Sequence, residues 1–420
     1  MSRRRASLHM ERQIAQINNG VSVGESEKDA GSTNSKAGKQ ATGKQLVAIV
    51  FILTIATKMF LLPIFLINTT GRDAYIALSV ICGFELITLG VILLAMKIGE
   101  ADFFTLMISL FGKVGAKIVV GFFGLFMFFK LNIAVAEALS FYGDNIFTDF
   151  SPAIMIFVLL FFLAAAGVHT LRALCRLNEL LIPLIVVCMA ILVAIVIMTG
   201  VDLSNILPTL QNGGEFGDGL LHHLAWLGDF TPLVLFIGRT KMKKHTGLLA
   251  AASGVVGTSI AVFFALVMSS AFGNAPMLAD MGTNLSTILQ FAIGNVYGRI
   301  DMFSSMLWSI SVFIESALFF YSTARCIAFV IGKNSNLLIS LGVCAALYFS
   351  QVFVMTDPTL FSEIVRSFAC SVIVAAYAVV MPVLAIVGAA VDKRKRASDR
   401  MDGDNAQAEA SRQTATEAKE

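Results

Sequence analysis

Apolar runs of twenty or more residues, separated by short polar loops, recur along the chain from about residue 44 onward. Runs of this length cross the hydrocarbon core of a bilayer when they form α-helices. A membrane β-barrel would instead use strands of roughly 10 residues with alternating polarity. The sequence predicts ten membrane-spanning helices, at residues 45–68, 73–96, 115–142, 152–170, 178–200, 219–239, 246–272, 301–331, 337–356 and 363–391.

The segments outside these spans differ in character. Residues 1–43 are rich in Ser, Gly, Asn, Gln and charge, which is typical of a disordered tail. Residues 101–112 are too few to cross a bilayer and predict a short amphipathic helix on its surface. Residues 273–299 are mixed in polarity and predict a helical cap or a re-entrant piece. A membrane domain at 44–391 is therefore expected between two polar tails, the second at 392–420.

Composition supports this class and narrows the function. Of the 420 residues, 57% are hydrophobic and only 14% are charged, whereas soluble domains carry about 25% charged residues. The chain contains no Walker loop, GxSxG, HExxH or Rossmann glycine pattern, so we expect neither an enzyme nor a cofactor. The expected partner of so apolar a surface is the lipid bilayer and not a nucleic acid. Six cysteines without CxxC spacing predict small buried residues rather than metal ligands: Cys82, Cys175, Cys188, Cys326, Cys344 and Cys370.

Basic residues gather in alternate loops, which predicts an orientation. With the N-terminus in the cytoplasm, the inner loops hold Lys97, Lys113, Lys117, Arg172, Arg176, Arg239, Lys241, Lys243, Lys244, Arg325 and Lys333, and Lys393 to Arg396 follow the last span. The outer loops hold Arg72, Arg299 and Arg366 and are otherwise acidic, with Asp144, Asp149, Asp202, Glu215, Asp218, Asp280 and Asp357. Because positively charged loops stay inside, both termini are expected in the cytoplasm.

Ionisable residues within the spans are candidate functional groups, since a charge at membrane depth costs several kcal/mol unless it faces protein, water or a partner. Lys58 lies midway along the first span, Glu85 in the second, Asp229 in the sixth and Glu315 in the eighth. Lys58, Asp229 and Glu315 lie too deep for easy snorkelling to the surface. This depth favours a role in binding or conduction.

Lys130, Glu137 and Asp144 recur every seven residues in the third span and so share one helix face. Together with Glu315, Lys130 and Glu137 fit an ion or water pathway. The alternative is a structural Lys130–Glu137 pair, with Asp144 at the water interface.

Two further polar pairs have structural explanations. His222 and His223 stand at the outer mouth of the sixth span, and without further ligands they predict a hydrated interface feature rather than a metal site. Arg299 and Asp301 precede the eighth span, where they are expected to cap and anchor that helix.

Two spans carry helix-breaking residues. The first reads IATKMFLLP from residue 55, and the sixth reads WLGDFTPL from residue 226. Proline removes a backbone donor and disfavours helix in the residue before it. Interrupted helices at corresponding positions of two halves mark the sites of many secondary transporters, and spans one and six are the positions that an inverted five-plus-five repeat requires. An ordinary proline kink is the alternative.

Five stretches resemble, in order, the spore germination receptor B subunits (GerAB-like). They are KQLVAIVFILTIATKMFLLP, GRDAYIALSV, GVHTLRALCRLNELLIPLIV, NILPTL and GRIDMFSSMLWSISVF, within residues 44–332. That family is similar in fold to the amino acid/polyamine/organocation (APC) transporters, whose spans one and six are unwound around the substrate. The resemblance implies an all-α membrane protein of about ten helices, with an inverted five-plus-five repeat and broken helices one and six.

By position, the resemblance places the unwound stretches at Ile55–Met59 and Leu227–Thr231. It implies a ligand site formed by Ala56, Thr57, Lys58, Gly228, Asp229 and Thr231. The family often has a glycine in the first stretch and a glutamate in the sixth span. Here the first stretch contains Ala-Thr-Lys and the nearest acid is Asp229, so the charge of the site differs.

The function implied is that of the membrane B subunit of a nutrient germinant receptor in the inner membrane of a bacterial spore. A small germinant, typically an amino acid, would bind and shift a two-state bundle, with a larger membrane A subunit and a C-subunit lipoprotein as partners. A proton- or sodium-coupled amino acid permease needs the same pocket and is the alternative. A channel lined by the Lys130–Glu137–Asp144 face is a third hypothesis.

One contact follows from the cost of burying charge. An unpaired lysine at the depth of Lys58 is expensive, so we expect it to lie near Asp229 or Glu137. The germinant carboxylate would then bind Lys58 and the half-helix N-termini, and its amine would bind Asp229.

Overall fold

The computed structural model describes residues 41–59, 61–145, 151–168, 170–198, 203–207, 209–210, 213–274, 300–332, 336–356 and 363–417. Every element named within these ranges is a helix, and the β-pairing there is confined to one bridge between Ala41 and Thr240. The predicted all-α class is therefore confirmed. The expected N-terminal tail and the segment 273–299 lie largely outside the described residues.

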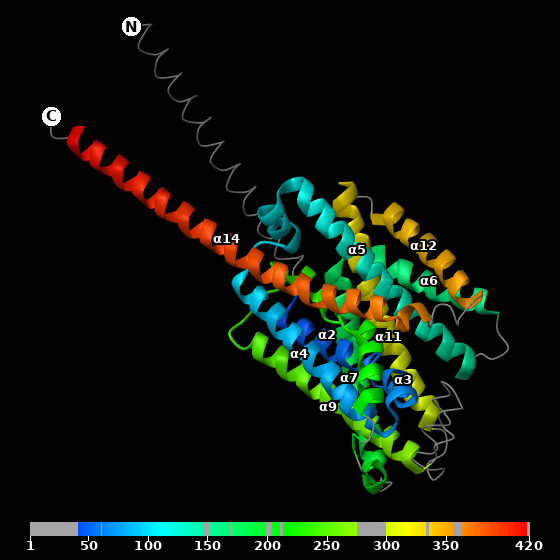
Figure 1. The fold of residues 1–420 in the computed structure, drawn as a ribbon. Coiled ribbons are helices and arrows are strands. Elements are labelled where there is room, and N and C mark those ends of the chain that lie inside the picture. Colours follow the sequence, from blue (N-terminus) through cyan, green and yellow to red (C-terminus); the bar gives the residue numbers. More distant parts are fainter. Residues whose placement is uncertain are drawn as a thin grey trace. The chain divides into compact units, whose positions relative to one another are not determined.

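The helices follow the predicted spans in order (Figure 1). They are α2 (Gly43–Ile55), α3 (Leu61–Thr70), η1 (Gly71–Asp73), α4 (Ala74–Ile98), α5 (Phe103–Asn145), α6 (Pro152–Val168), α7 (Leu171–Met198), η2 (Leu203–Ile206), α8 (Gly213–His222), η3 (Leu224–Trp226), η4 (Thr231–Phe236), α9 (Thr246–Asn274), α11 (Ile300–Ile331), α12 (Asn336–Thr356) and α14 (Phe368–Glu417). Within the described residues, seven stretches are long and apolar enough to cross a membrane.

The other three predicted spans fall short of that length for physical reasons. The fourth span is helix α6, which is wholly apolar but short. The first and the sixth spans are interrupted, so neither contains one long continuous helix. The interruptions thus fall in the two spans whose helix-breaking residues predicted them.

Large apolar side chains on the outer faces of the helices identify the surface that lipid covers. Such faces would be unstable in water, whereas in a bilayer they contact acyl chains. Exposed examples on α6 and α7 are Phe157, Phe161, Leu180, Val187 and Ile197. All six cysteines carry free thiols, three buried and three half-buried.

Three helix boundaries differ from the predictions. Helix α7 begins at Leu171 rather than at 178, because its first two turns are amphipathic and bury one stripe of Leu171, Leu174, Cys175 and Asn178. The short helix predicted at 101–112 forms the start of α5, and Gly112, with φ 70° and ψ 178°, separates it from the span. The C-terminal tail continues α14 as helix to Glu417.

Helices α5 and α11 lie side by side along much of their length, and α2 packs against α9 and α7 (Figure 1). Helix α4 packs between α9 and α14 and also reaches η4, which α5 and α11 contact as well. Elements α4, α5 and α11 together with α14, which contacts both η3 and η4, therefore surround the interrupted sixth span. This packing brings residues from five parts of the chain to one place.

A backbone clasp joins the two interrupted spans at one end. The amide of Ala41 donates to the carbonyl of Arg239 at 2.8 Å, and the amide of Lys241 donates to the carbonyl of Ala41 at 3.2 Å. The chain enters the first span and leaves the sixth span at this point. The clasp therefore fixes the start of the first span beside the end of the sixth.

Candidate functional site

The first span is interrupted after Ile55. Helix α2 ends at Ile55, residues 56–59 form a turn, and α3 begins at Leu61. Pro63 lies in the first turn of α3, where a missing amide hydrogen costs no helical bond. Ala56, Thr57 and Lys58 are all buried in the turn. The predicted break at Ile55–Met59 is confirmed.

The sixth span breaks more extensively. Between η3 and η4 the chain is extended at Leu227 and turns at Asp229 and Phe230. Gly228 has φ +96°, a conformation that side-chain-bearing residues rarely adopt. A Cβ atom there would also lie 2.8 Å from Cζ of Phe126. The glycine is needed for this geometry, and the break predicted at Leu227–Thr231 is confirmed.

Asp229 lies between two lysines where the breaks meet. Lys58 forms an ion pair with Oδ2 of Asp229, and Nζ of Lys130 lies 2.8 Å from Oδ1. Thr57 donates its hydroxyl to the same Oδ2 at 3.3 Å. The three charged side chains are only 1–3% exposed. The expected contact of Lys58 with Asp229 is confirmed.

Glu85 of α4 supports the backbone of the second break. Its Oε1 accepts from the amide of Gly228 and, at 3.3 Å, from the amide of Asp229. Thr231 donates its hydroxyl to the carbonyl of Gly228 at 2.5 Å. Unwound backbone at membrane depth is stable only when its polar groups find such partners. The sequence indicated that Glu85 lies at membrane depth, but the predicted site did not include it. Its position as a single acid in an apolar span was the feature that pointed to a functional role.

Lys130 and Glu137 do not pair with each other, which corrects one of the predictions. Lys130 contacts Asp229 and also lies 3.4 Å from the carbonyl of Ala225. Glu137 accepts from Nε1 of Trp226 at 2.5 Å. Both α5 side chains thus contact η3 of the interrupted sixth span, Lys130 at Ala225 and Glu137 at Trp226. The side chain of Asp144, the third member of that face, lies outside the described residues.

The sequence predicted that His223 is a hydrated residue at the membrane interface, and this prediction is wrong. Its side chain is wholly buried and stacks on the ring of Trp226, with 5.2 Å between ring centroids. Its Nδ1 lies 2.7 Å from the carbonyl of Gly219. His222 is only half-buried. Arg299 and the side chain of Asp301 lie outside the described residues.

Glu315 of α11 completes the charged cluster. It is 0% exposed, and neither carboxyl oxygen has a hydrogen-bond partner in the described part of the chain. It interacts electrostatically with both lysines, with Asp229 and with Glu137. The cluster therefore sets two lysines against four carboxyl groups inside the bundle. No group of three or more His, Cys, Asp or Glu side chains among the described residues could hold a metal ion.

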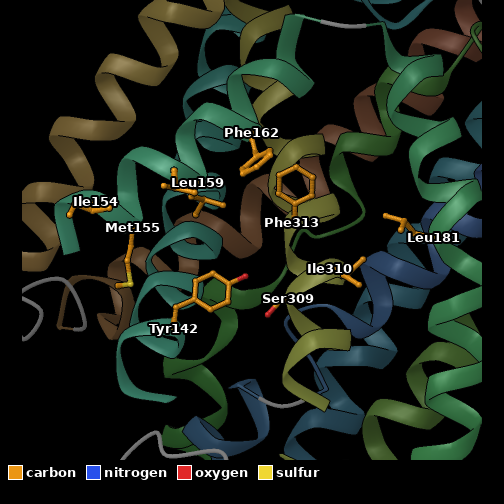
Figure 2. Close-up of a pocket in the computed structure, with 10 residues that line it drawn as sticks. Tyr142, Ile154, Met155, Leu159, Phe162, Leu181, Ser309, Ile310 and Phe313 are labelled. Carbon is orange, nitrogen blue, oxygen red and sulfur yellow. The ribbon is translucent and has the colours of Figure 1, made fainter. Parts of the chain in front are cut away.

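A separate cavity of about 470 Å³ lies among α5, α6, α7 and α11 (Figure 2). Its lining is almost entirely apolar, and Figure 2 shows the hydroxyl groups of Tyr142 and Ser309 directed toward each other. None of the described residues that line it is charged. Ile154 and Phe162 of its wall are more than half exposed on the lipid-facing side. This cavity suits an apolar occupant and is distinct from the charged cluster.

Comparisons with known proteins agree with this architecture. The sequence model of a family described as spore germination protein (spore permease) matches residues 40–358. A search of curated proteins found no match. Among solved structures, the chain is similar to Mhp1, a nucleobase-cation-symport-1 family transporter, in a closed conformation with bromovinylhydantoin bound. The TM-score is 0.52 at 13% sequence identity, and the match covers 85% of this chain and 92% of that one. The expected transporter fold with broken first and sixth helices is therefore confirmed.

Proposed function

Because this chain belongs to the spore germination protein family and has the fold of a membrane transporter, we propose that it is the membrane subunit of a spore nutrient-germinant receptor. In this proposal a small germinant, an amino acid or a similar solute, binds where the two helix breaks meet. Binding shifts the bundle between two states and so starts germination. Neither an enzymatic reaction nor a cofactor is involved.

One observation carries the proposal, namely the ion cluster of Lys58, Asp229 and Lys130 at the meeting point of the two breaks. A bundle held together only for stability has no need of charges in its centre, since replacing a buried ion pair by apolar side chains is often neutral or stabilising. Charges at this depth are instead typical of substrate and ion sites. The breaks add backbone groups that a polar ligand uses for recognition.

Signal transfer is the second part of the proposal. The breaks face α4, α5 and α11, so a ligand that rearranges the cluster changes how these helices pack. We propose a larger membrane A subunit and a C-subunit lipoprotein as the partners that receive the change, in the inner membrane of the spore. Both termini would then face the cytoplasm.

A self-sufficient permease is the second candidate, and the similarity to Mhp1 favours it. It would move an amino acid or similar solute together with H⁺ or Na⁺ through the same site. Uptake by vesicles containing only this chain separates the two candidates. Concentrative uptake supports the permease, whereas binding without uptake supports the receptor subunit.

The proposed function is tested by the nutrient dose response of spores carrying Lys58→Met or Asp229→Asn. Both variants are expected to shift or abolish the response, because each removes one charge from the cluster. Lys241→Met, at an exposed lysine outside the cluster, is the matched control. Wild-type dose responses of both variants at normal protein levels would overturn the proposal.

A further inference from the structure

The unwound part of the sixth span contains a binding place for a carboxylate, and a side chain of the same protein occupies it. The successive amides of Gly228 and Asp229 both donate to one oxygen, Oε1 of Glu85. Adjacent backbone N–H groups directed at one point form an anion-binding concavity. Glu85 comes from α4, so the anion in this concavity is a side chain from another helix.

The same part of the chain offers a place for an ammonium group, and this place is also filled. Nζ of Lys58 contacts Oδ2 of Asp229 and lies 5.9 Å from the ring centroid of Phe230. A carboxylate beside an aromatic face is a suitable cage for an ammonium ion. Lys130 uses the other carboxylate oxygen and also reaches the carbonyl of Ala225, so it is anchored at two points.

We propose that Lys58 and Glu85 act as a built-in substitute for a zwitterionic ligand, so that the site is self-occupied in this state. The ammonium group of Lys58 binds the side-chain carboxylate of Asp229, and we call this the ammonium place. The carboxylate of Glu85 binds the backbone amides of Gly228 and Asp229, and we call this the carboxylate place. The two places therefore share Asp229, which lets one small zwitterion contact both. The inference rests on the proposed function and adds to it that the chain's own side chains occupy the ligand site.

Charge balance explains how such a ligand enters. Its amine takes the place of Lys58 at Asp229, and its carboxylate takes the place of Glu85 at the two amides. The displaced Lys58 and Glu85, which already interact electrostatically, then pair with each other. The ligand brings one positive and one negative charge, so the net charge of the site is the same before and after, and neither displaced side chain is left without a partner. The exchange moves the first break and α4 relative to the sixth span, which links occupancy to a change of packing.

The test opens each place separately in the full-length protein and offers it a single-charge probe. Lys58→Ala empties the ammonium place while Lys130 still neutralises Asp229, and Lys58→Met is the matched control that removes the charge but keeps the volume filled. Glu85→Ala empties the carboxylate place, and Glu85→Gln is the matched control that keeps a carbonyl oxygen for the two amides. The probes are methylammonium for the first pair and acetate for the second, at equal ionic strength.

The measurement is the Tm of the purified protein as each probe is titrated. At ten times its Kd, a probe is expected to raise the Tm by on the order of 2 °C in the matching alanine variant. Wild type and the two matched controls are expected to show no saturable rise. Adding Asp229→Asn to Lys58→Ala is expected to abolish the methylammonium effect.

The outcomes distinguish this inference from the proposed function. If neither alanine variant gains a saturable Tm rise, or if the matched controls gain the same rise, the site is not self-occupied. If that happens while Asp229→Asn spores fail to respond to nutrient, the inference is wrong and the proposed function stands. If the alanine variants gain the rise but Lys58→Met and Asp229→Asn spores respond normally, the inference stands without the receptor function.

Discussion

Lys58 and Asp229 lie 171 positions apart in the chain and form an ion pair inside the helix bundle. Lys58 comes from the break in the first span and Asp229 from the break in the sixth, so the pair joins the two discontinuities directly. Both side chains are almost unexposed, at 1% and 2%. A buried pair of this kind determines geometry more than it adds stability. The effect of removing the pair on ligand binding can therefore be measured separately from its effect on the free energy of unfolding.

Asp229→Asn alone is expected to lower the free energy of unfolding more than a triple variant that removes Lys58, Lys130 and Asp229 together. The substitution leaves Lys58 and Lys130 buried without their anion, which costs about 3–5 kcal/mol. The triple variant Lys58→Met, Lys130→Met and Asp229→Asn removes all three charges together and is expected to recover most of that loss. Reversible unfolding in mixed detergent micelles measures the free energy of unfolding of each variant.

The comparison between these two variants decides the interpretation. If Asp229→Asn stays within about 1 kcal/mol of wild type, the two lysines have other counter-charges and the described cluster is not their main source of pairing. If the triple variant is less stable than the single one, the charges contribute net stability instead of fixing geometry.

Gly228→Ala is expected to lower stability and to impair ligand binding. Its φ of +96° strains a residue that bears a side chain, and the added Cβ would lie 2.8 Å from Cζ of Phe126. Together the strain and the clash are expected to cost roughly 2 kcal/mol. Gly90→Ala is the matched control, because this helical glycine of α4 has no atom within 4 Å of an added Cβ. The control is expected to gain up to about 1 kcal/mol from its higher helix propensity. Equal effects at the two glycines would contradict the described backbone at Gly228.

The sequence was sufficient to predict the two breaks and a contact of Lys58 with either Asp229 or Glu137, of which the structure shows the first. Proline and glycine act locally, so neighbouring residues predict helix-breaking points in the first and sixth spans. The bounds 55–59 and 227–231 came from the family resemblance. The contact followed from the cost of an unpaired lysine at membrane depth. The family resemblance added the expectation that the two breaks face each other.

The partners of Glu85, Lys130 and Glu137 could not be predicted because they depend on tertiary packing. Spacing of seven residues places Lys130 and Glu137 on one face of α5, but it does not say which groups that face meets. Lys130 meets Asp229 and Glu137 meets Trp226, both in the sixth span. The burial of His223 is a similar case, since its position near a helix end suggested hydration while the ring packs on Trp226.

Glu137 is expected to act through its hydrogen bond to Trp226. Glu137→Gln keeps an acceptor oxygen for the indole N–H and is expected to stay within about 1 kcal/mol of wild type. Glu137→Ala leaves the indole N–H without its partner and is expected to cost about 1–3 kcal/mol. The emission of Trp226, recorded in a Trp308→Phe background, reports whether the indole environment changes. If the Gln variant shifts the emission as far as the Ala variant, the charge of Glu137 matters more than the hydrogen bond.

The same Glu137→Gln variant tests whether Lys130, Glu137 and Glu315 line an ion or water pathway. A pathway that depends on the negative charge of Glu137 is expected to lose permeability in vesicles containing the variant. Glu315→Gln is the companion variant, since both oxygens of Glu315 lack a partner among the described residues. Unchanged ion and water permeability in both variants would remove the pathway hypothesis while leaving the binding site untouched.

Thiol labelling is expected to confirm the orientation predicted from loop charge. Asp218 and Lys244 are both exposed, and they stand on either side of the broken sixth span. The basic loop at 239–244 predicts a cytoplasmic position for Lys244 and an outer position for Asp218. A membrane-impermeant maleimide applied to intact cells is therefore expected to label the Asp218→Cys variant, whereas Lys244→Cys reacts only after permeabilisation. Wild type is the control for the six native thiols, of which three are buried and three half-buried. The opposite labelling pattern would invert the orientation and place the acidic loops in the cytoplasm.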